Sequence, residues 1–140
     1  MSKRTAGAAT ILVVDDEPIA LEFCRSTLVR AGYKVLTAST AKQALSHFES
    51  CRSPIDLALI DVVMPGMNGV ELVKRLERLS PGTRIVLMSG YSPDEVKRIV
   101  ADDASSYRSM WKPFEAATLV QTVKNVLGMT VQMRAARASE

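Results

Sequence analysis

The sequence predicts an α/β fold in which a doubly wound, five-stranded parallel sheet is covered by helices on both faces. Short apolar runs rich in Val, Ile and Leu alternate along the chain with longer segments in which apolar residues recur at helical spacing. Polar or turn-forming residues end each apolar run. The chain has 140 residues, of which 47% are hydrophobic and 24% are charged. This length and this balance suit a single globular domain with a core on each side of the sheet.

The first half of the chain repeats a unit of strand followed by helix. Ile11–Val14 is a continuous apolar run, as expected for a strand buried on both faces, and Asp15–Pro18 ends it. The helix that follows is capped at its C-terminus by Gly32. Apolar residues recur in this helix at roughly helical spacing: Ile19, Leu21, Phe23, Leu28 and Val29. The next elements are a strand, a helix opened by a Thr cap and a buried strand: Tyr33–Ala38, Thr40–Ser50 and Ile55–Ile60.

The second half of the chain continues the alternation. A turn-rich stretch at 64–69 leads into a third helix over Val70–Leu79. The remaining elements are a strand, a helix with Pro in its first turn, a weaker strand and a final helix: Arg84–Met88, Ser92–Ala101, Ser109–Lys112 and Phe114–Leu127. We therefore expect one domain over residues 10–128, a flexible N-terminus at 1–9 and a tail or helix extension at 129–140.

Composition and charge argue against several classes of function. The formal net charge of +3 arises partly at the two ends of the chain rather than on one basic face, which argues against direct nucleic-acid binding. Cys24 and Cys51 lack the spacing of a metal site or a redox motif, so we expect reduced, structural thiols. No segment of the sequence resembles a signal peptide or a membrane span, and we expect a cytoplasmic protein without a membrane partner.

Polar side chains close four of the predicted strands. Asp15 and Asp16 follow the first strand, Asp61 the third, Ser89 the fourth and Lys112 the fifth. In doubly wound folds the functional groups gather at the carboxyl ends of the strands. If the strand order is 2-1-3-4-5, the first and third strands are neighbours, and their carboxylates must lie close together.

Crowded carboxylates require a compensating charge. Two unit charges about 4 Å apart repel by roughly 4 kcal/mol at an effective dielectric constant near 20. A donor set made only of oxygen favours a hard divalent cation, and Mg²⁺ fits better than Ca²⁺. Such a site suits phosphoryl transfer, with Asp61 as the nucleophile and Lys112 neutralising charge on the transferred group. The Ser89 hydroxyl is then placed to hold the product.

The segments that carry these residues resemble those of response-regulator receiver domains. They are ILVVDDEP (11–18), LALIDVVMPGMNGVEL (57–72), IVLMSGY (85–91) and WKPF (111–114). The resemblance covers about Thr10 to Gly128 and implies a flavodoxin-like (βα)5 fold with sheet order 2-1-3-4-5. It also implies a signalling switch rather than an enzyme, one that assists its own phosphorylation and dephosphorylation.

The resemblance implies a role for each site residue. Asp61 takes a phosphoryl group from a phosphohistidine on a sensor histidine kinase or a histidine phosphotransfer protein. Mg²⁺ is bound by the side chains of Asp16 and Asp61 and by the backbone carbonyl of Val63, with Asp15 acting through water. The bond between Lys112 and Pro113 is expected to be cis.

Two positions depart from the usual pattern of this family. Ser109 stands three residues before the lysine, where an aromatic side chain usually rotates on activation, so the sequence does not predict the usual aromatic switch. Val63 and Tyr91 occupy flanking positions that are often polar and that orient the water for hydrolysis of the acyl phosphate. Our hypothesis is that an apolar Val63 and a bulky Tyr91 exclude this water and give a long-lived phosphorylated form.

Three other interpretations are weaker. A phosphatase of the haloacid-dehalogenase type needs a second Asp two residues after the nucleophile, and the sequence has Val63 there. An FMN-binding flavodoxin needs neutral donors after the first strand, where the acidic run 15–17 would repel a phosphate. A binding module without the chemistry would not need all five site residues.

We expect the output surface to be the face formed by the fourth helix, the fifth strand and the fifth helix. This face includes Arg98, Tyr107, Trp111 and the tail at 129–137. It is the natural surface for a homodimer or a downstream protein, because it adjoins Ser89 and Lys112. The lone histidine, His47, is expected to be solvated or partly packed.

Overall fold

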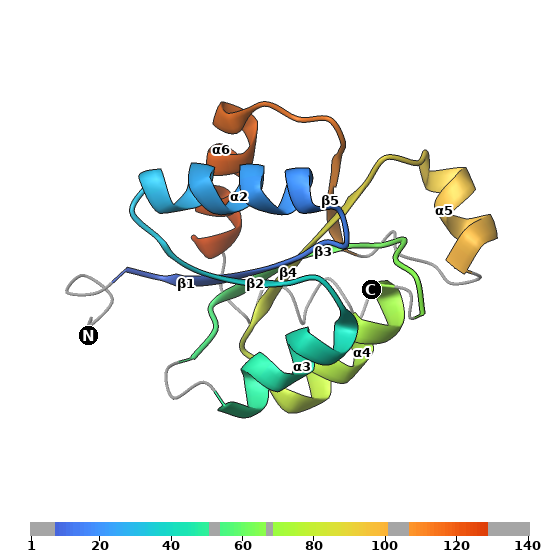
Figure 1. The fold of residues 1–140 in the computed structure, drawn as a ribbon, viewed down its shortest axis with the longest axis horizontal. Helices are drawn as coiled ribbons and strands as arrows, with labels where there is room; N and C mark the ends of the chain where they lie inside the picture. Colours follow the sequence, from blue (N-terminus) through green and yellow to red (C-terminus); the bar gives the residue numbers. More distant parts are fainter. Residues whose placement is uncertain (1–7, 51–53, 67–68, 101–106, 129–140) are drawn as a thin grey trace.

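The computed structural model describes residues 8–50, 54–66, 69–100 and 107–128, which form the layered α/β fold of Figure 1. Five parallel strands make one sheet in the order β2-β1-β3-β4-β5, which confirms the predicted fold class and strand order. The strands are β1 Thr10–Val14, β2 Lys34–Ala38, β3 Leu57–Asp61, β4 Arg84–Ser89 and β5 Arg108–Trp111.

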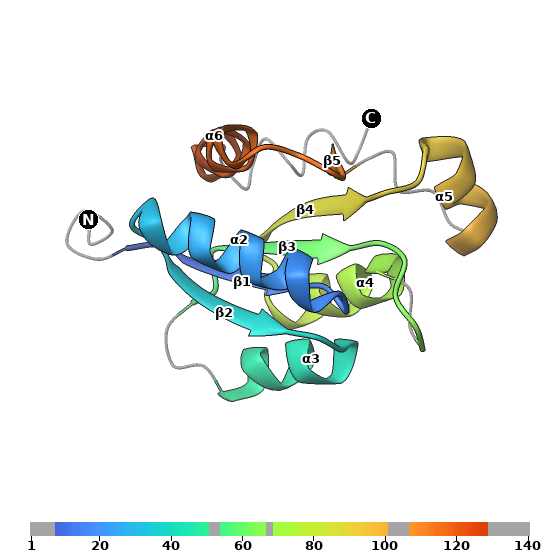
Figure 2. The ribbon, with the colours of Figure 1, turned by 45° about the horizontal axis from the view of Figure 1, so that its top comes forward.

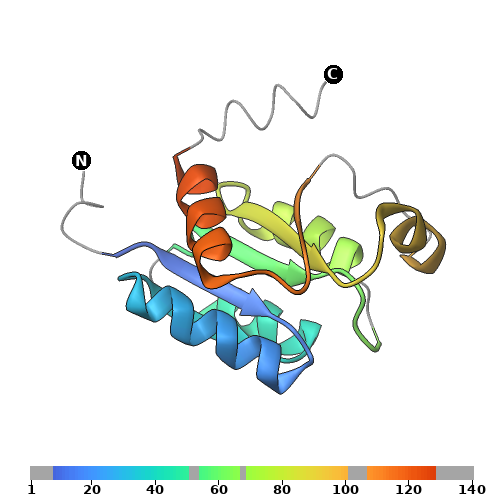
Figure 3. The same ribbon diagram turned by 90° about the horizontal axis from the view of Figure 1, so that it is seen from above.

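Helices cover both faces of the sheet. α2 and α6 lie on one face and α3 and α4 on the other, as Figures 1 and 2 show. Seen from above in Figure 3, α2 and α6 lie in front of the sheet and α4 lies behind it. α5 lies beyond the carboxyl end of β4 in Figure 2. The helices are α2 Pro18–Arg30, α3 Ala41–Ser50, α4 Gly69–Leu79, α5 Pro93–Val100 and α6 Ala116–Leu127.

The central strands bury both of their faces, as their continuous apolar runs predict. In β1, Leu12 and Val14 belong to the core beneath α3 and α4, whereas Ile11 and Val13 belong to the core beneath α2 and α6. All four side chains are fully buried. Alternate residues of a strand point to opposite faces, so one short run contributes to both cores. This double burial fixes the register that aligns the carboxyl ends of the strands.

Several element boundaries differ from the prediction by one or two residues. β4 ends at Ser89 rather than at Met88, and β5 ends at Trp111, so Lys112 follows the strand. β3 extends to Asp61, which pairs with Met88 of β4, so the predicted nucleophile is the last residue of a paired strand. α6 begins at Ala116 rather than at Phe114, and Glu115 is its extended N-cap residue. The reason is that Phe114 packs against the core beneath α2 and α6 before the helix starts.

The apolar pattern predicts α2 correctly but not its buried face. Cys24 and Leu28 are the buried residues of this helix. Ile19 is 86% exposed, Phe23 38% and Val29 46%. A helix on a sheet buries only the stripe of side chains that faces the sheet, and the apolar residues of α2 extend beyond that stripe. Exposed apolar side chains therefore remain near the N-terminus of α2.

Gly32 adopts a φ of 100°, the left-handed conformation expected of the glycine that follows α2. Among the described residues, no helix has the length and apolar character needed to cross a membrane. Cys51 and the expected tail at 129–140 lie outside the described residues, as does most of the expected N-terminal segment.

Candidate functional site

The sheet brings the three predicted acids together. β1 and β3 are adjacent, with Val14 opposite Ile60, so the residues that follow Val14 lie beside Asp61. One carboxylate oxygen from each of Asp15, Asp16 and Asp61 lies within 4.8 Å of the other two. Asp15 is fully buried and Asp61 is 6% exposed, whereas Asp16 is the most accessible of the three. The strand order thus produces the acidic cluster that the sequence predicts.

Lys112 supplies the positive charge of the site. Its Nζ lies 2.7 Å from Oδ2 of Asp15 and 3.1 Å from Oδ2 of Asp61. It also donates a hydrogen bond of 3.2 Å to Oε1 of Glu17. The contact with Asp61 places Lys112 beside the predicted nucleophile. Glu17 is a site residue that the sequence pattern did not predict, although its position directly after the acid pair, at the same strand end, was the available signal.

Burial and charge perturb the two central groups in a consistent way. Burial raises the pKa of Asp61 from 3.8 to about 6, and the charge of Asp15 adds to this effect. Lys112 and the backbone N–H of Val63, 3.2 Å from Oδ1, oppose the increase only in part. For Lys112, burial disfavours the ammonium form, but the contacts with Asp15 and Asp61 outweigh burial and raise the pKa. The cluster therefore holds excess negative charge once Asp61 ionises.

Ser89 ends β4 beside this cluster and is 6% exposed. Its hydroxyl accepts the N–H of Tyr91 at 2.9 Å, and its carbonyl accepts the N–H of Lys112 at 2.8 Å. Trp111, which pairs with Ser89 across the sheet, donates its indole N–H to the carbonyl of Tyr91 at 3.1 Å. The segment 89–91 is therefore connected to the end of β5 by the side chain of Trp111 and to the residue that follows β5 by a backbone hydrogen bond.

The residues present fit a Mg²⁺ ion. The donor set is carboxylate oxygen, which a hard cation prefers. Oδ2 of Asp15 is buried and has no hydrogen-bond partner among the described residues, although it forms the ion pair with Lys112. Asp16, Asp61 and Val63 all line one hollow of about 570 Å³, which is open to a ligand. A buried carboxylate oxygen that lacks a hydrogen bond, beside two further carboxylates, is an arrangement that a cation and its waters would complete.

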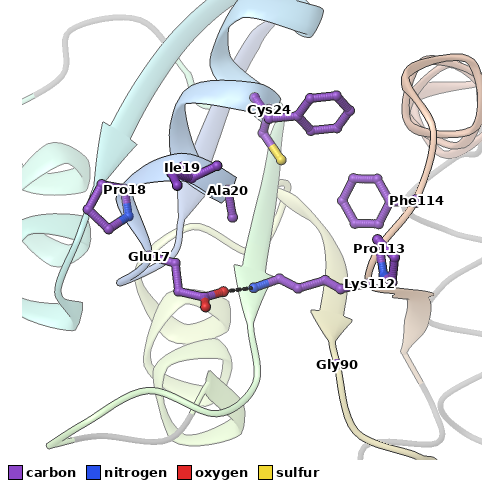
Figure 4. Close-up of a pocket in the computed structure, with 10 residues that line it drawn as sticks. Glu17, Pro18, Ile19, Ala20, Cys24, Gly90, Lys112, Pro113 and Phe114 are labelled. Carbon is purple, nitrogen blue, oxygen red and sulfur yellow. Dashed lines mark hydrogen bonds and ion pairs between the residues drawn. The ribbon is translucent and has the colours of Figure 1, made fainter.

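A second hollow, of about 800 Å³, adjoins the first (Figure 4). Ile19, Phe23 and Phe114 contribute to its mainly apolar wall, and the rings of Phe23 and Phe114 lie 6.1 Å apart. The two hollows share three lining residues: Glu17, Gly90 and Lys112. In Figure 4, Glu17 and Lys112 point toward each other from opposite sides. An apolar surface therefore leads directly to the acidic site.

Cys24 lies in the wall of the apolar hollow as a free, buried thiol. Burial raises its pKa to about 12, with a contribution from the charge of Asp15, so the thiol stays protonated. A buried, protonated thiol agrees with the structural role expected of Cys24. The bond between Lys112 and Pro113 is cis, as expected.

The residues of the expected output surface differ in their exposure and in their contacts. Trp111 is 63% exposed, and Ser109 and Arg98 are exposed as well. Tyr107 is half-buried, and its hydroxyl donates to Oε1 of Glu77 in α4 at 3.0 Å. Tyr107 therefore packs toward α4 and not toward Ser89, so Trp111 is the aromatic residue that contacts the loop 89–91.

Gly69 and His47 each make one close contact, the first at the site and the second in α3. Gly69 begins α4 directly against the backbone of Asp61, where an added Cβ would lie 2.5 Å from the Asp61 carbonyl oxygen. His47 is half-buried, and its Nε2 lies 2.8 Å from the carbonyl oxygen of Thr37. The first contact explains a requirement for glycine beside the site, and the second agrees with the partly packed role expected of His47.

Comparison with known proteins agrees with this geometry. Residues 11–124 match the family model described as the response regulator receiver domain. The chain is 34% identical over 120 residues to the transcriptional regulatory protein AruR of Pseudomonas aeruginosa, covering 84% of this chain and 48% of AruR. It is 34% identical over 122 residues to the sensor kinase CckA of Brucella abortus, covering 87% of this chain and 13% of CckA.

Solved structures show the same fold. The chemotaxis protein CheY4 of Vibrio cholerae is 31% identical, with a TM-score of 0.71 over 86% of this chain and 99% of CheY4. A CheY-like receiver domain protein of Methanospirillum hungatei is 28% identical, with a TM-score of 0.72 over 86% of this chain and 94% of that protein. The chain spans about half of AruR and a small part of CckA, so those likenesses concern one domain. The chain belongs to the response regulator receiver domain family, the phosphoacceptor domains of two-component signalling.

Proposed function

We propose that this domain is a Mg²⁺-dependent switch in which Asp61 accepts a phosphoryl group from a phosphohistidine on a sensor histidine kinase or a histidine phosphotransfer protein. One observation carries the proposal. The oxygens of Asp15, Asp16 and Asp61 lie within 4.8 Å of one another, and the Lys112 ammonium lies 3.1 Å from Asp61. A carboxylate beside further acids and a fixed cation is suited to phosphoryl transfer.

The proposed chemistry assigns a task to each residue. An Asp61 carboxylate oxygen bonds to phosphorus while the bond from phosphorus to the histidine nitrogen breaks, and the electron pair leaves with the imidazole. Lys112 neutralises charge on the phosphoryl oxygens, and the Ser89 hydroxyl donates to one of them. Asp16, Asp61, the Val63 carbonyl and, through water, Asp15 would hold a Mg²⁺ ion, which would supply further charge neutralisation. The domain itself is a switch that assists its own phosphorylation and dephosphorylation.

The phosphohistidine donor protein binds over the apolar hollow, because a protein that reaches Asp61 must contact the residues around the opening of the acidic hollow. Ile19 and Phe23 are exposed there, and the hollow shares Glu17 and Lys112 with the acidic site. Phe23→Asp should slow transfer from a phosphohistidine donor and leave labelling by acetyl phosphate unchanged. Equal effects on both reactions would contradict this role for the hollow.

Output passes through the loop 89–91 to the face formed by α5, β5 and α6, where a homodimer or a downstream protein binds. Trp111 connects this face to Ser89 through Tyr91. The proposal includes no direct contact with nucleic acid. It places the domain in the cytoplasm, since the free Cys24 thiol suits a reducing compartment.

Acetyl phosphate and Mg²⁺, followed by intact-mass measurement, test the proposal. The wild type should gain one phosphate, and Asp61→Asn should gain none. Asp94→Asn, a substitution at an exposed residue in the first turn of α5, serves as the matched control and should be labelled like the wild type. Labelling of Asp61→Asn at the wild-type rate, or no Mg²⁺-dependent labelling of any variant, would refute the assignment.

A further inference from the structure

The Lys112 ammonium faces a carboxylate oxygen in each of three directions. Nζ lies 2.7 Å from Asp15, 3.1 Å from Asp61 and 3.2 Å from Glu17. An ammonium group carries three N–H bonds and accepts no hydrogen bond. Nζ donates hydrogen bonds to Asp61 and Glu17 and forms an ion pair with Asp15, so three carboxylates crowd it in the unphosphorylated protein.

A phosphoryl group on Asp61 brings further acceptor oxygens to this crowded position. One of the three carboxylates must give up its place before Lys112 can bind a phosphoryl oxygen. Asp15 is fully buried, and its Oδ1 is held at 2.9 Å by the N–H of Glu17, whereas Asp61 itself carries the new group. The Glu17 side chain is 65% exposed and has open space on both sides, in the two hollows that it separates. Glu17 is the carboxylate that can turn into solvent.

We propose that Glu17 is a displaceable partner of Lys112, which occupies the position on the ammonium that a phosphoryl oxygen takes and thereby lowers the affinity of the site for the phosphoryl group. The inference rests on the proposed function. Glu17 is a positioning residue, since it acts through Lys112. Two physical effects both lower the affinity for the phosphoryl group. The Glu17 carboxylate competes for an N–H donor of Lys112, and its charge repels the phosphoryl oxygens.

The size of the effect follows from the exposure of the pair. An exposed ion pair is weak, because water solvates both partners and salt screens them. Removing the Glu17 charge should therefore tighten the binding of a phosphoryl analogue by about two- to fivefold at low salt. The gain should shrink as the salt concentration rises, which a purely structural role for Glu17 does not predict.

Titration of the full chain with beryllofluoride at saturating Mg²⁺, followed by calorimetry, tests the proposal. Glu17→Gln should bind beryllofluoride two to five times more tightly than the wild type in dilute buffer, and the two should converge in 1 M KCl, where about 3 Å of screening length remains. Glu22→Gln is the matched control, because Glu22 lies in α2, the helix that begins directly after Glu17 in the chain, and pairs with Arg25 away from Lys112; it should bind like the wild type.

Equal or weaker binding of beryllofluoride by Glu17→Gln at saturating Mg²⁺ overturns the proposal. A parallel titration with Mg²⁺ alone separates the alternative that Glu17 helps to hold the cation, for which Glu17→Gln would bind Mg²⁺ less well and show no tighter beryllofluoride binding. Failure of the wild type to bind beryllofluoride at all would count against the proposed function itself, and is thus distinguishable from failure of the role of Glu17.

Discussion

The ammonium of Lys112 lies closer to Asp15, at 2.7 Å, than to Asp61, at 3.1 Å. Asp15 is fully buried, so this ion pair compensates a charge that water does not reach. Asp15 therefore anchors the lysine. The other oxygen of Asp61, Oδ1, accepts a hydrogen bond of 3.2 Å from the backbone N–H of Val63. The geometry separates the residue that holds Lys112 from the residue proposed to react.

Lys112→Met should destabilise the protein in the presence of a metal chelator. The substitution leaves Asp15 buried without its cation, and we expect the free energy of unfolding to fall by about 3 kcal/mol. Urea denaturation monitored by circular dichroism measures the loss. Lys124→Met, at an exposed position of α6, is the control and should change stability by about 0.5 kcal/mol or less. Equal losses for both variants would contradict the anchoring role.

The difference in stability between Asp61→Asn and the wild type should depend on pH. The folded protein raises the pKa of Asp61 from 3.8 to about 6, so the native state binds this proton more tightly than the unfolded state. The stabilisation from the bound proton is present below about pH 4 and is lost as the pH rises through about 6. Asn mimics the neutral carboxyl group. With a chelator present, Asp61→Asn should therefore match the wild type near pH 4 and exceed it by about 1–3 kcal/mol above pH 7.

Thermal and urea unfolding of both proteins at several pH values check this expectation. Asp94→Asn serves as the control for the loss of an acid at an exposed position. A stability difference between Asp61→Asn and the wild type that is constant from pH 4 to pH 8 would show that the charge of Asp61 does not strain the fold.

Gly69→Ala should damage the site through the backbone. A Cβ at this position would lie 2.5 Å from the carbonyl oxygen of Asp61 and 2.8 Å from Cα of Val62, so the end of β3 must shift. We expect a loss of about 1–3 kcal/mol in stability and slower labelling by acetyl phosphate. Gly82→Ala is the control, because an added Cβ there meets nothing within 4 Å. Wild-type labelling of Gly69→Ala would show that Asp61 tolerates the shift.

Val63→Asn should shorten the lifetime of the phosphorylated form. Val63 and Tyr91 both line the hollow that contains Asp61, and a polar amide at 63 would position a water for attack on the acyl phosphate. The decay of the phosphorylated protein, measured by intact mass after removal of acetyl phosphate, gives the half-life. Val29→Asn, the same change at an exposed position of α2, should leave it unchanged. An unchanged or longer half-life for Val63→Asn would end the hypothesis of water exclusion.

Trp111 should report the state of the site. It is the one tryptophan of the sequence, and its indole N–H bonds to the carbonyl of Tyr91. If the Ser89 hydroxyl turns toward a phosphoryl group, the N–H of Tyr91 loses its acceptor and the loop moves relative to Trp111. The emission of Trp111 should therefore change when beryllofluoride and Mg²⁺ bind, and not in Asp61→Asn. Binding detected by calorimetry without any change in emission would argue against this coupling.

The amino-acid sequence by itself determined the sheet and the edge on which the site lies. The continuous run Ile11–Val14 predicted a strand buried on both faces, and the structure buries all four of its side chains. Because parallel strands align their carboxyl ends, Asp15 and Asp61 were expected to meet if the strand order was 2-1-3-4-5, the order that the motifs of the family imply. These inferences depend on patterns that are local in the sequence.

Only the tertiary structure decided which side chains contact one another and which apolar residues stay exposed. Glu17 and Lys112 are 95 residues apart, and Tyr107 contacts a residue of α4. The exposure of Ile19 likewise depends on how α2 lies against the sheet and α6. Such contacts depend on register and helix placement across the whole domain, to which distant segments contribute, so local composition and periodicity do not contain them.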